Sequence, residues 1–406
     1  MIKQIQTKQL RVGMYIEKLG GSWIQHPFLR SSFLVTNPDD IKRILQAGIR
    51  DVWIDESKSE IGLDEDQPLL AKTEQQISAE ATASSDKQQV KKKQEPRSMD
   101  ADIELARKIC HSGKKQVMAM FQDVRLGKAI DPESTLPLVQ QIDALVQNNS
   151  AAILSVARLK THDDYTYMHS IAVCALMISL ARQLELDDDM IRLAGIGGMM
   201  HDLGKALMPI DILNKPGKLT DAEYDIMKAH PKAGADMLKE SDAEAAVIDI
   251  ALHHHEKMNG FGYPNQLKGE DISLLSRMAA ICDVYDAVTS ERAYKKPWEP
   301  ANTIRLMASW EGHFDKHIFN AFVKSIGIYP VGSLVRLTSQ HLAVVTEPTP
   351  DLLLKPKVKI FFSLKSKAPV PLKVIDLAAH SCKDSIEGPE ERADWNFKSL
   401  DDLWML

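Results

Sequence analysis

The sequence predicts a mainly α-helical protein with a small β-rich part at each end. From residue 101 to about residue 326, apolar residues recur at helical spacing, with no sustained alternation of period two. Residues 1–56 and 329–406 instead contain short runs of strand-forming residues. We therefore expect an all-helical domain at 101–328, preceded by a β-rich module and followed by a short β-containing tail.

The N-terminal module, residues 1–56, is expected to contain three strands and one short helix. Strand-forming residues cluster at 11–19, 33–36 and 51–55. The helix is predicted to start in the segment NPDD at 37–40, where Asn supplies an N-cap, Pro takes the first helical position and the acidic residues lie at the positive end of the helix dipole. A module of this size is expected to be marginally stable alone.

Residues 57–100 are predicted to form a flexible polar linker. This segment is rich in Gln, Ser, Lys, Glu and Asp, and it has too few large apolar residues to offset the entropy lost on ordering. Its lysine run at 91–93 has two interpretations, an interaction patch or a solvated charged segment. We favour the solvated segment.

The helical domain shows its repeat in sets such as Ile103, Ala106 and Ile109. The predicted helices lie at roughly 101–122, 134–148, 150–160, 164–184, 188–202, 221–228, 232–239, 243–254, 273–288 and 300–310. After Tyr329-Pro330 the pattern changes, and the runs SLVRLTS, HLAVVTE and VKIFFSL are predicted to be short strands of the C-terminal extension, 329–406.

Composition and charge exclude several classes of protein. A net charge of −6 argues against broad binding of duplex nucleic acid. The four cysteines are scattered without a CxxC pair, which argues against a disulfide framework and against a thiolate zinc site. The most apolar run, 171–181, is too short to span a bilayer, and the N-terminus lacks the apolar core of a signal peptide. We therefore expect a cytoplasmic protein with no membrane span.

Histidines and aspartates gather in the helical domain. Each of them alone has an ordinary interpretation, a hydrogen-bonded core histidine or an acid at a helix end. Together they indicate a centre for hard or borderline metal ions, because buried ionisable groups are costly unless they are paired or coordinated. The residues concerned are His169, the pair His201-Asp202, His230, the triplet at 253–255 and Asp283.

Four ordered motifs in this domain resemble those of the HD-GYP phosphodiesterases. They are HDLGK at 201–205, HPKAG at 230–234, HHEKMNGFGYP at 254–264 and CDVYDAVTSERAYKK at 282–296, and the resemblance covers about residues 150–330. It implies a bacterial signalling enzyme with an HD-superfamily fold that hydrolyses cyclic di-GMP to pGpG or GMP, or else 3′,3′-cGAMP. The sequence leaves the choice between these two substrates open.

The resemblance also implies two divalent metal ions, iron or manganese. The metal ligands that the resemblance implies are His169, His201, Asp202, His230, His254, His255 and Asp283, with Asp202 bridging the ions. Family members with a third ion carry an acid four residues before the first histidine, where this chain has Tyr165. We therefore expect two ions; in the alternative with three ions, the neighbouring Asp164 would reach inward as the missing acid.

The proposed reaction is attack on phosphorus by a hydroxide that bridges the two ions. Lys205 would stabilise a phosphate oxygen. The alternative interpretation of Lys205 is a surface lysine at a helix end. Arg292 and Lys295 would clamp other phosphate oxygens, against the alternative of a solvated basic loop that better suits Lys296. Gly262 and Tyr263, in the loop NGFGYP, would contact the substrate.

Two further functions stay open at this point. In the family, the loop at 259–264 is also implicated in binding diguanylate-cyclase partner proteins. The N-terminal module resembles one often found ahead of HD-GYP domains, and its expected role is to regulate or dimerise the enzyme. A catalytically silent cyclic-dinucleotide sensor is the alternative of a different class. A general HD phosphohydrolase acting on ordinary nucleotides is disfavoured by the intact GYP loop.

Overall fold

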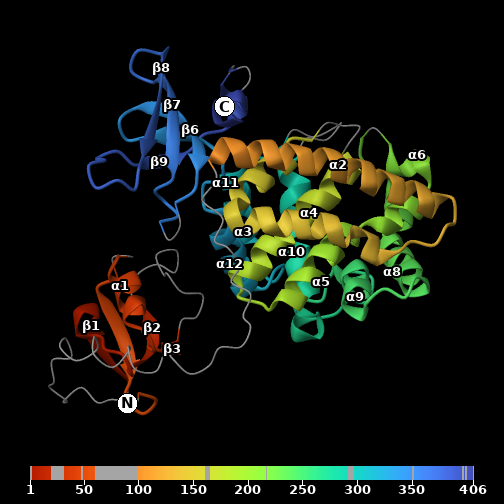
Figure 1. Cartoon of the computed structure of the whole chain (residues 1–406), viewed down its shortest axis with the longest axis horizontal. Helices are drawn as coiled ribbons and strands as arrows, with labels where there is room; N and C mark the ends of the chain where they lie inside the picture. The colour runs from red at the N-terminus through yellow and green to blue at the C-terminus, as the bar shows by residue number, and fades with distance from the viewer. Residues whose placement is uncertain are drawn as a thin grey trace, which may run out of the picture. The chain divides into compact units, whose positions relative to one another are not determined.

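The computed structural model divides the chain into two compact units, Met1–Pro96 and Arg97–Leu406 (Figure 1). It describes residues 2–19, 32–46, 49–59, 98–160, 165–215, 217–290, 297–349, 352–395, 397 and 400–405. The linker predicted at 57–100 lies almost entirely outside these residues. The mainly helical fold predicted from the sequence, with sheets near both ends, is confirmed.

The first unit is a four-stranded antiparallel sheet with one helix. The strands follow the order β1-β4-β2-β3, so that β4 pairs with both β1 and β2. Val52 and Ile54 of β4 are buried beside Ile16 and Ile44, which places the core between the sheet and α1. The elements are β1 (Ile2–Gln6), β2 (Tyr15–Leu19), β3 (Phe33–Leu34), α1 (Pro38–Gln46) and β4 (Asp51–Asp55).

The prediction omitted β1, because the sequence IKQIQ carries only two apolar residues and a single buried one, Ile5. It also started the next strand at residue 11, whereas β2 begins at Tyr15. Gly13 has a φ of 91°, which L-residues with a side chain rarely adopt, so the chain turns here before the strand starts.

In the second unit, the helices surround α4, which is buried along almost its whole length from Met168 to Ala181. A helix that is apolar on all sides is stable only in a core, and α4 packs against α2, α3, α5, α10 and α12. The helices are α2 (Met99–Arg125), α3 (Leu136–Arg158), α4 (Tyr165–Gln183), α5 (Asp188–Met200), α6 (Ile210–Leu213), α7 (Asp221–Met227), α8 (His230–Glu240), α9 (Ala245–His253), α10 (Leu274–Thr289), α11 (Pro300–Ser309) and α12 (Lys316–Ile326), with short 3₁₀ turns η3 (Pro132–Thr135), η5 (Leu203–Leu207) and η6 (Gly269–Asp271).

Two details of this unit differ from the prediction. The helices expected at 134–148 and 150–160 form one element, α3, whose backbone leaves the helical region at Asn149 (φ −159°, ψ 87°). The prediction also omitted α12, although its N-cap Asp315 accepts hydrogen bonds from the amides of His317 and Ile318. That cap, followed by apolar residues at helical spacing, was a signal present in the sequence.

The C-terminal extension is a five-stranded antiparallel sheet in the order β8-β7-β6-β5-β9. One face of the sheet packs on Ala151 of α3 and on Trp404. The prediction omitted β8 and β9, since Pro369 and Pro371 break the strand pattern; prolines are tolerated in β8 because it is an edge strand. The elements are β5 (Leu334–Leu337), β6 (His341–Glu347), β7 (Lys357–Ser363), β8 (Ala368–Asp376), β9 (Ile386–Pro389), the 3₁₀ turn η7 (Arg392–Asp394) and α13 (Asp402–Met405).

Two glycines allow η5 to lie directly against the start of α8. A Cβ atom at Gly204 would lie 2.0 Å from the carbonyl oxygen of His230 and 2.6 Å from the amide nitrogen of Gly234. No side chain is therefore compatible with this spacing. The contact brings the residues just before η5, His201 and Asp202, close to the first residue of α8.

Gly204→Ala is expected to lower the free energy of unfolding by about 1–3 kcal/mol, the range typical of overpacking, because the added Cβ meets backbone atoms rather than a flexible side chain. Urea unfolding of the full chain, followed by circular dichroism, measures this change. Gly388→Ala is the matched control, since no heavy atom lies within 4 Å of its Cβ position. Equal stability of both variants would contradict the close approach of η5 and α8.

Candidate metal centre

The structure brings all seven predicted metal ligands into one buried cluster between the helices. They form two sets in which the ligand atoms lie within 4.8 Å of one another, and Asp202 belongs to both. His169 comes from α4 and Asp283 from α10, whereas the other ligands stand at or next to helix ends. The sets are His169, His201, Asp202 and Asp283, and Asp202, His230, His254 and His255.

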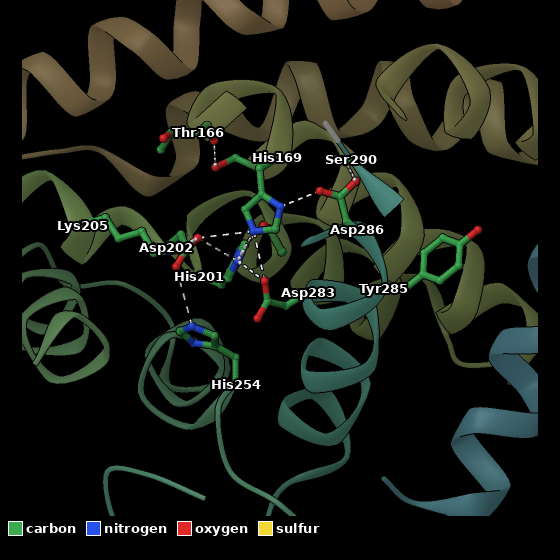
Figure 2. Close-up of polar contacts among 12 residues, drawn as sticks. Thr166, His169, His201, Asp202, Lys205, His254, Asp283, Tyr285, Asp286 and Ser290 are labelled. Carbon is green, nitrogen blue, oxygen red and sulfur yellow. Dashed lines mark hydrogen bonds and ion pairs between the residues drawn. The ribbon is translucent and has the colours of Figure 1, made fainter. Parts of the chain in front are cut away.

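The carboxylate of Asp202 lies between the two sets. Its Oδ2 atom is 3.3 Å from His169 Nε2 and 3.4 Å from His201 Nε2. Its Oδ1 atom is 3.2 Å from His230 Nε2 and 3.7 Å from His254 Nε2. Figure 2 shows Asp202 beside the rings of His169 and His201, with His254 on its other side. Each oxygen of this one carboxylate therefore faces a different pair of histidines.

Helix ends orient three of these histidines. The Nδ1 atom of His201 donates to the carbonyl of Gly198 at 2.8 Å, that of His230 to Met227 at 2.7 Å and that of His254 to Ala251 at 2.9 Å. These carbonyls lie in the last turns of α5, α7 and α9, where backbone oxygens lack a partner four residues further along the helix. Since a carbonyl only accepts, each Nδ1 carries the hydrogen, and in the neutral ring Nε2 presents a lone pair.

The arrangement of these lone pairs fits bound cations. His230 Nε2 and His254 Nε2 are 3.3 Å apart, so two acceptors face each other across a short gap. Asp202 Oδ1 is buried and, within the described part of the chain, accepts no hydrogen bond. An uncompensated buried carboxylate oxygen and converging imidazole nitrogens are costly unless a cation lies among them. The donor set of His nitrogens and carboxylate oxygens suits first-row divalent metals.

The pKa values of His201 and Asp202 show that positive charge is favoured in the half of the cluster that contains His169. Burial alone would lower the pKa of His201, but the carboxylates of Asp202 and Asp283 outweigh it and raise the value to about 10. Burial alone would raise the pKa of Asp202, yet Lys205 and His201 hold it well below its usual range. The charged forms of His201 and Asp202 are thus both stabilised, whereas burial and neighbouring histidines lower the pKa values of His254 and His255.

Lys205 and Tyr263 lie at the edge of the cluster. Lys205 Nζ donates to Asp202 Oδ2 at 2.5 Å, and its side chain is 23% exposed. The ring of Tyr263 lies over that of His255, with centroids 4.7 Å apart. At Gly262 a Cβ atom would lie 2.4 Å from the Cα of Glu256, so only glycine lets the loop backbone pass this close. Lys205 therefore lies beside the carboxylate of Asp202, and the loop of Gly262 and Tyr263 lies beside His255.

Several of the predicted residues cannot be placed. Arg292, Lys295 and Lys296 belong to residues 291–296, and Asp164 to residues 161–164, all of which lie outside the described residues. Tyr165 is described, and its ring stacks on that of His169 at a centroid distance of 5.6 Å. It brings no carboxylate to this side of the cluster.

Sequence reasoning missed three buried charged residues around the ligands. Asp286 Oδ2 accepts from His169 Nδ1 at 2.6 Å, and Lys160 Nζ forms an ion pair with the same oxygen. Glu256 accepts from the backbone amides of Asn265 and Leu267, at 2.7 and 3.1 Å, and so holds the loop after Tyr263. A signal for Asp286 was present, since it follows Asp283 by three residues and thus shares its face of α10.

Comparison with known proteins gives matches along the whole chain. A family model described as HD domain matches residues 140–318, and a domain of unknown function, DUF3391, matches residues 2–135. A cyclic di-GMP phosphodiesterase of Pseudomonas aeruginosa is 48% identical over 406 residues, which is 100% of this chain and 96% of the relative.

Two further relatives match a smaller part of the chain. The cyclic di-GMP phosphodiesterase response regulator RpfG of Xanthomonas campestris is 37% identical over 36% of this chain and 39% of its own length. A 3′3′-cGAMP-specific phosphodiesterase of Vibrio cholerae is 33% identical over 47% of this chain and 44% of its own length. Among the described residues, no helix has the length and apolar character needed to cross a membrane.

Asp202→Asn is expected to reduce the metal content of the purified protein. The amide keeps the size of the side chain but offers a single neutral acceptor oxygen, so it cannot present an anionic oxygen to both histidine pairs. Elemental analysis after gel filtration measures the loss. Asp236→Asn is the matched control, because this carboxylate lies on α8 with 59% of its side chain exposed. Unchanged metal content in Asp202→Asn would contradict a central role for this carboxylate.

Proposed function

This chain belongs to the HD-GYP family of cyclic di-GMP phosphodiesterases, and from that membership we propose how its buried cluster carries out the reaction. The protein is a metal-dependent enzyme that hydrolyses a phosphodiester bond of a cyclic dinucleotide. The observation that carries the proposal is the Asp202 carboxylate, with Oδ2 facing His169 and Oδ1 facing His230. A carboxylate shared in this way is suited to two cations.

The proposed cofactors are two divalent ions, iron or manganese, since imidazole and carboxylate ligands suit both metals. One position is formed by His169, His201, Asp202 and Asp283, and the other by Asp202, His230, His254 and His255. When bound, such a pair of ions supplies Lewis acidity toward phosphate oxygens and lowers the pKa of a water molecule that attacks phosphorus. Tyr165 stands where family members with a third ion carry an acid, and this supports two ions rather than three.

Lys205 is proposed to bind a non-bridging phosphate oxygen. Its ammonium group lies beside Asp202 at the partly exposed edge of the cluster, where it can stabilise the negative charge that builds up in the transition state. Arg292 and Lys295 are proposed, from the sequence pattern alone, to hold the remaining phosphate oxygens. The paired donors of a guanidinium suit Arg292 to two oxygens at once.

Cyclic di-GMP is the substrate that we propose, with pGpG or GMP as the product. The relative matched over 96% of its own length is named a cyclic di-GMP phosphodiesterase, whereas the 3′3′-cGAMP-specific relative is matched over 44%. We propose that Tyr263, whose ring lies beside that of His255, stacks on a base of the substrate. Gly262 is proposed to contact the substrate as well, since its loop passes close to Glu256.

A protein-binding role for the GYP loop is supported by Phe261, whose side chain is 81% exposed at the loop. An aromatic side chain in this position suits a partner that carries a diguanylate-cyclase domain. We also propose the N-terminal module as the part that regulates or dimerises the enzyme. The alternative of a silent sensor is disfavoured because all seven ligands converge.

The purified protein, loaded anaerobically with ferrous iron or manganese, is expected to cleave cyclic di-GMP faster than 3′3′-cGAMP. Chromatography of the products measures both rates. Asp202→Ala is expected to abolish cleavage, because the shared carboxylate is removed. If the protein with verified metal content cleaves neither ring, it is a sensor and the proposed function is wrong.

Lys205→Met is expected to reduce kcat by about 10²–10³-fold, the effect typical of removing one group that stabilises transition-state charge. Metal content should stay at the wild-type level, since this side chain belongs to neither ligand set. Steady-state kinetics with cyclic di-GMP checks the prediction. Lys232→Met is the control, because Lys232 lies on α8 with 69% of its side chain exposed. Equal kcat in the two variants would remove Lys205 from the reaction.

A further inference from the structure

His169 differs from the other histidines around Asp202 in what lies behind its ring. The Nδ1 atoms of His201, His230 and His254 donate to backbone carbonyls, as described above. Within the described residues, His169 alone among these four has a carboxylate there, with Nδ1 2.6 Å from Asp286 Oδ2. Figure 2 shows the His169 ring between Asp286 on one side and Asp202 and Asp283 on the other.

Asp286 is itself held by a buried lysine. Lys160, two residues after the end of α3, places Nζ against Asp286 Oδ2, and the side chains of the two residues are 0% and 4% exposed. A lysine is almost never this deeply buried unless it is paired, because burying an ammonium group is costly. Asp286, more than a hundred residues further along the chain, therefore joins Lys160 and His169 in one line of contacts.

The two halves of the cluster also differ in charge. The ligand set that contains His169 has two carboxylates, Asp202 and Asp283, whereas the other set has three histidines and shares only Asp202. Asp283 is nearer to the first set, with Oδ1 3.0 Å from His169 Nε2, than to the second, with Oδ2 3.6 Å from His255 Nδ1. His255 of that second half is also 21% exposed, unlike the fully buried His201. A divalent cation is attracted more strongly where the ligands carry more negative charge and are screened less by water.

We propose that Lys160 and Asp286 are positioning residues that make the metal position of His169, His201, Asp202 and Asp283 the tighter of the two. A carboxylate that accepts from Nδ1 of a metal-binding imidazole fixes the direction of the ring. It also makes Nε2 a more basic metal ligand than a backbone carbonyl in the same place would. Lys160 keeps Asp286 in place by neutralising it in the core. This inference rests on the proposed function, since it assumes the two-metal centre.

A merely structural ion pair would behave differently. Its removal would lower the stability of the metal-free protein and weaken both metal positions alike. The double variant Lys160→Met/Asp286→Asn separates the two cases, because it removes both charges of the ion pair together. Lys160→Met alone would leave the buried Asp286 carboxylate without its lysine. Thermal melting of the full chain in the presence of a chelator verifies that the double variant folds.

The experiment is a manganese titration of the full-length protein, with bound metal counted by elemental analysis and followed by electron paramagnetic resonance. The wild type is expected to reach the coupled spectrum of two neighbouring ions. In the double variant, one binding step is expected to weaken by about 10–100-fold, the usual effect of losing such a partner, while the other step is unchanged. At intermediate manganese the double variant should therefore show the six-line spectrum of a single ion.

Two backgrounds identify which ion is affected. In a protein that carries His230→Ala, the remaining ion occupies the His169 half. Adding Lys160→Met and Asp286→Asn to this protein should weaken the binding of that ion by about 10–100-fold. In a protein that carries His169→Ala, the remaining ion occupies the other half. Adding Lys160→Met and Asp286→Asn there should leave its affinity for manganese unchanged. Equal weakening in both backgrounds, or none in either, would overturn the inference while the wild type still binds two ions. A wild type that binds fewer than two ions would overturn the proposed function as well.

Discussion

The buried carboxylate of Asp202, with one oxygen toward each pair of histidines, is the interaction on which the rest of this site depends. It stands just after α5, where the chain leaves the helix, and its neighbours His230 and His254 also stand at helix ends, whereas His169 lies within α4. The unsatisfied carbonyls of those ends hold His201, His230 and His254 with Nε2 inward. The last turn of every helix contains carbonyl groups without a backbone partner, and here three such carbonyls orient the histidines of the cluster.

Close helix packing sets the spacing between these ends. Gly198 lets α5 approach α4 until a Cβ atom would lie 3.0 Å from the Cα of Cys174, and Gly204 lets η5 approach α8. Glycine costs about 1 kcal/mol relative to alanine inside a helix, yet a larger residue at either position would push His201 and Asp202 away from their partners. Local helix stability is thus given up where the cluster needs short distances.

Much of the site could be predicted from the sequence, and its ligands converge as the motifs indicated. The motifs are local strings, and their histidines and aspartates are recognisable without knowing how the helices pack. Lys160 was missed because it belongs to no motif and because its partner lies 126 residues away on α10. A lysine at a helix end normally suggests solvent, and only the packing of α3, α4 and α10 turns this one inward.

The sequence by itself determined the fold class, most helix positions and the identity of the residues that form the buried cluster, because helical periodicity, caps and motifs are encoded within a few residues. Tertiary structure alone decided which oxygen of Asp202 faces which histidine, which ring nitrogen carries the hydrogen, and that Asp286 lies behind His169. The physical reason is that these directions follow from contacts between helices far apart in the chain. Local sequence fixes which face of a helix a side chain occupies, but not what that face meets.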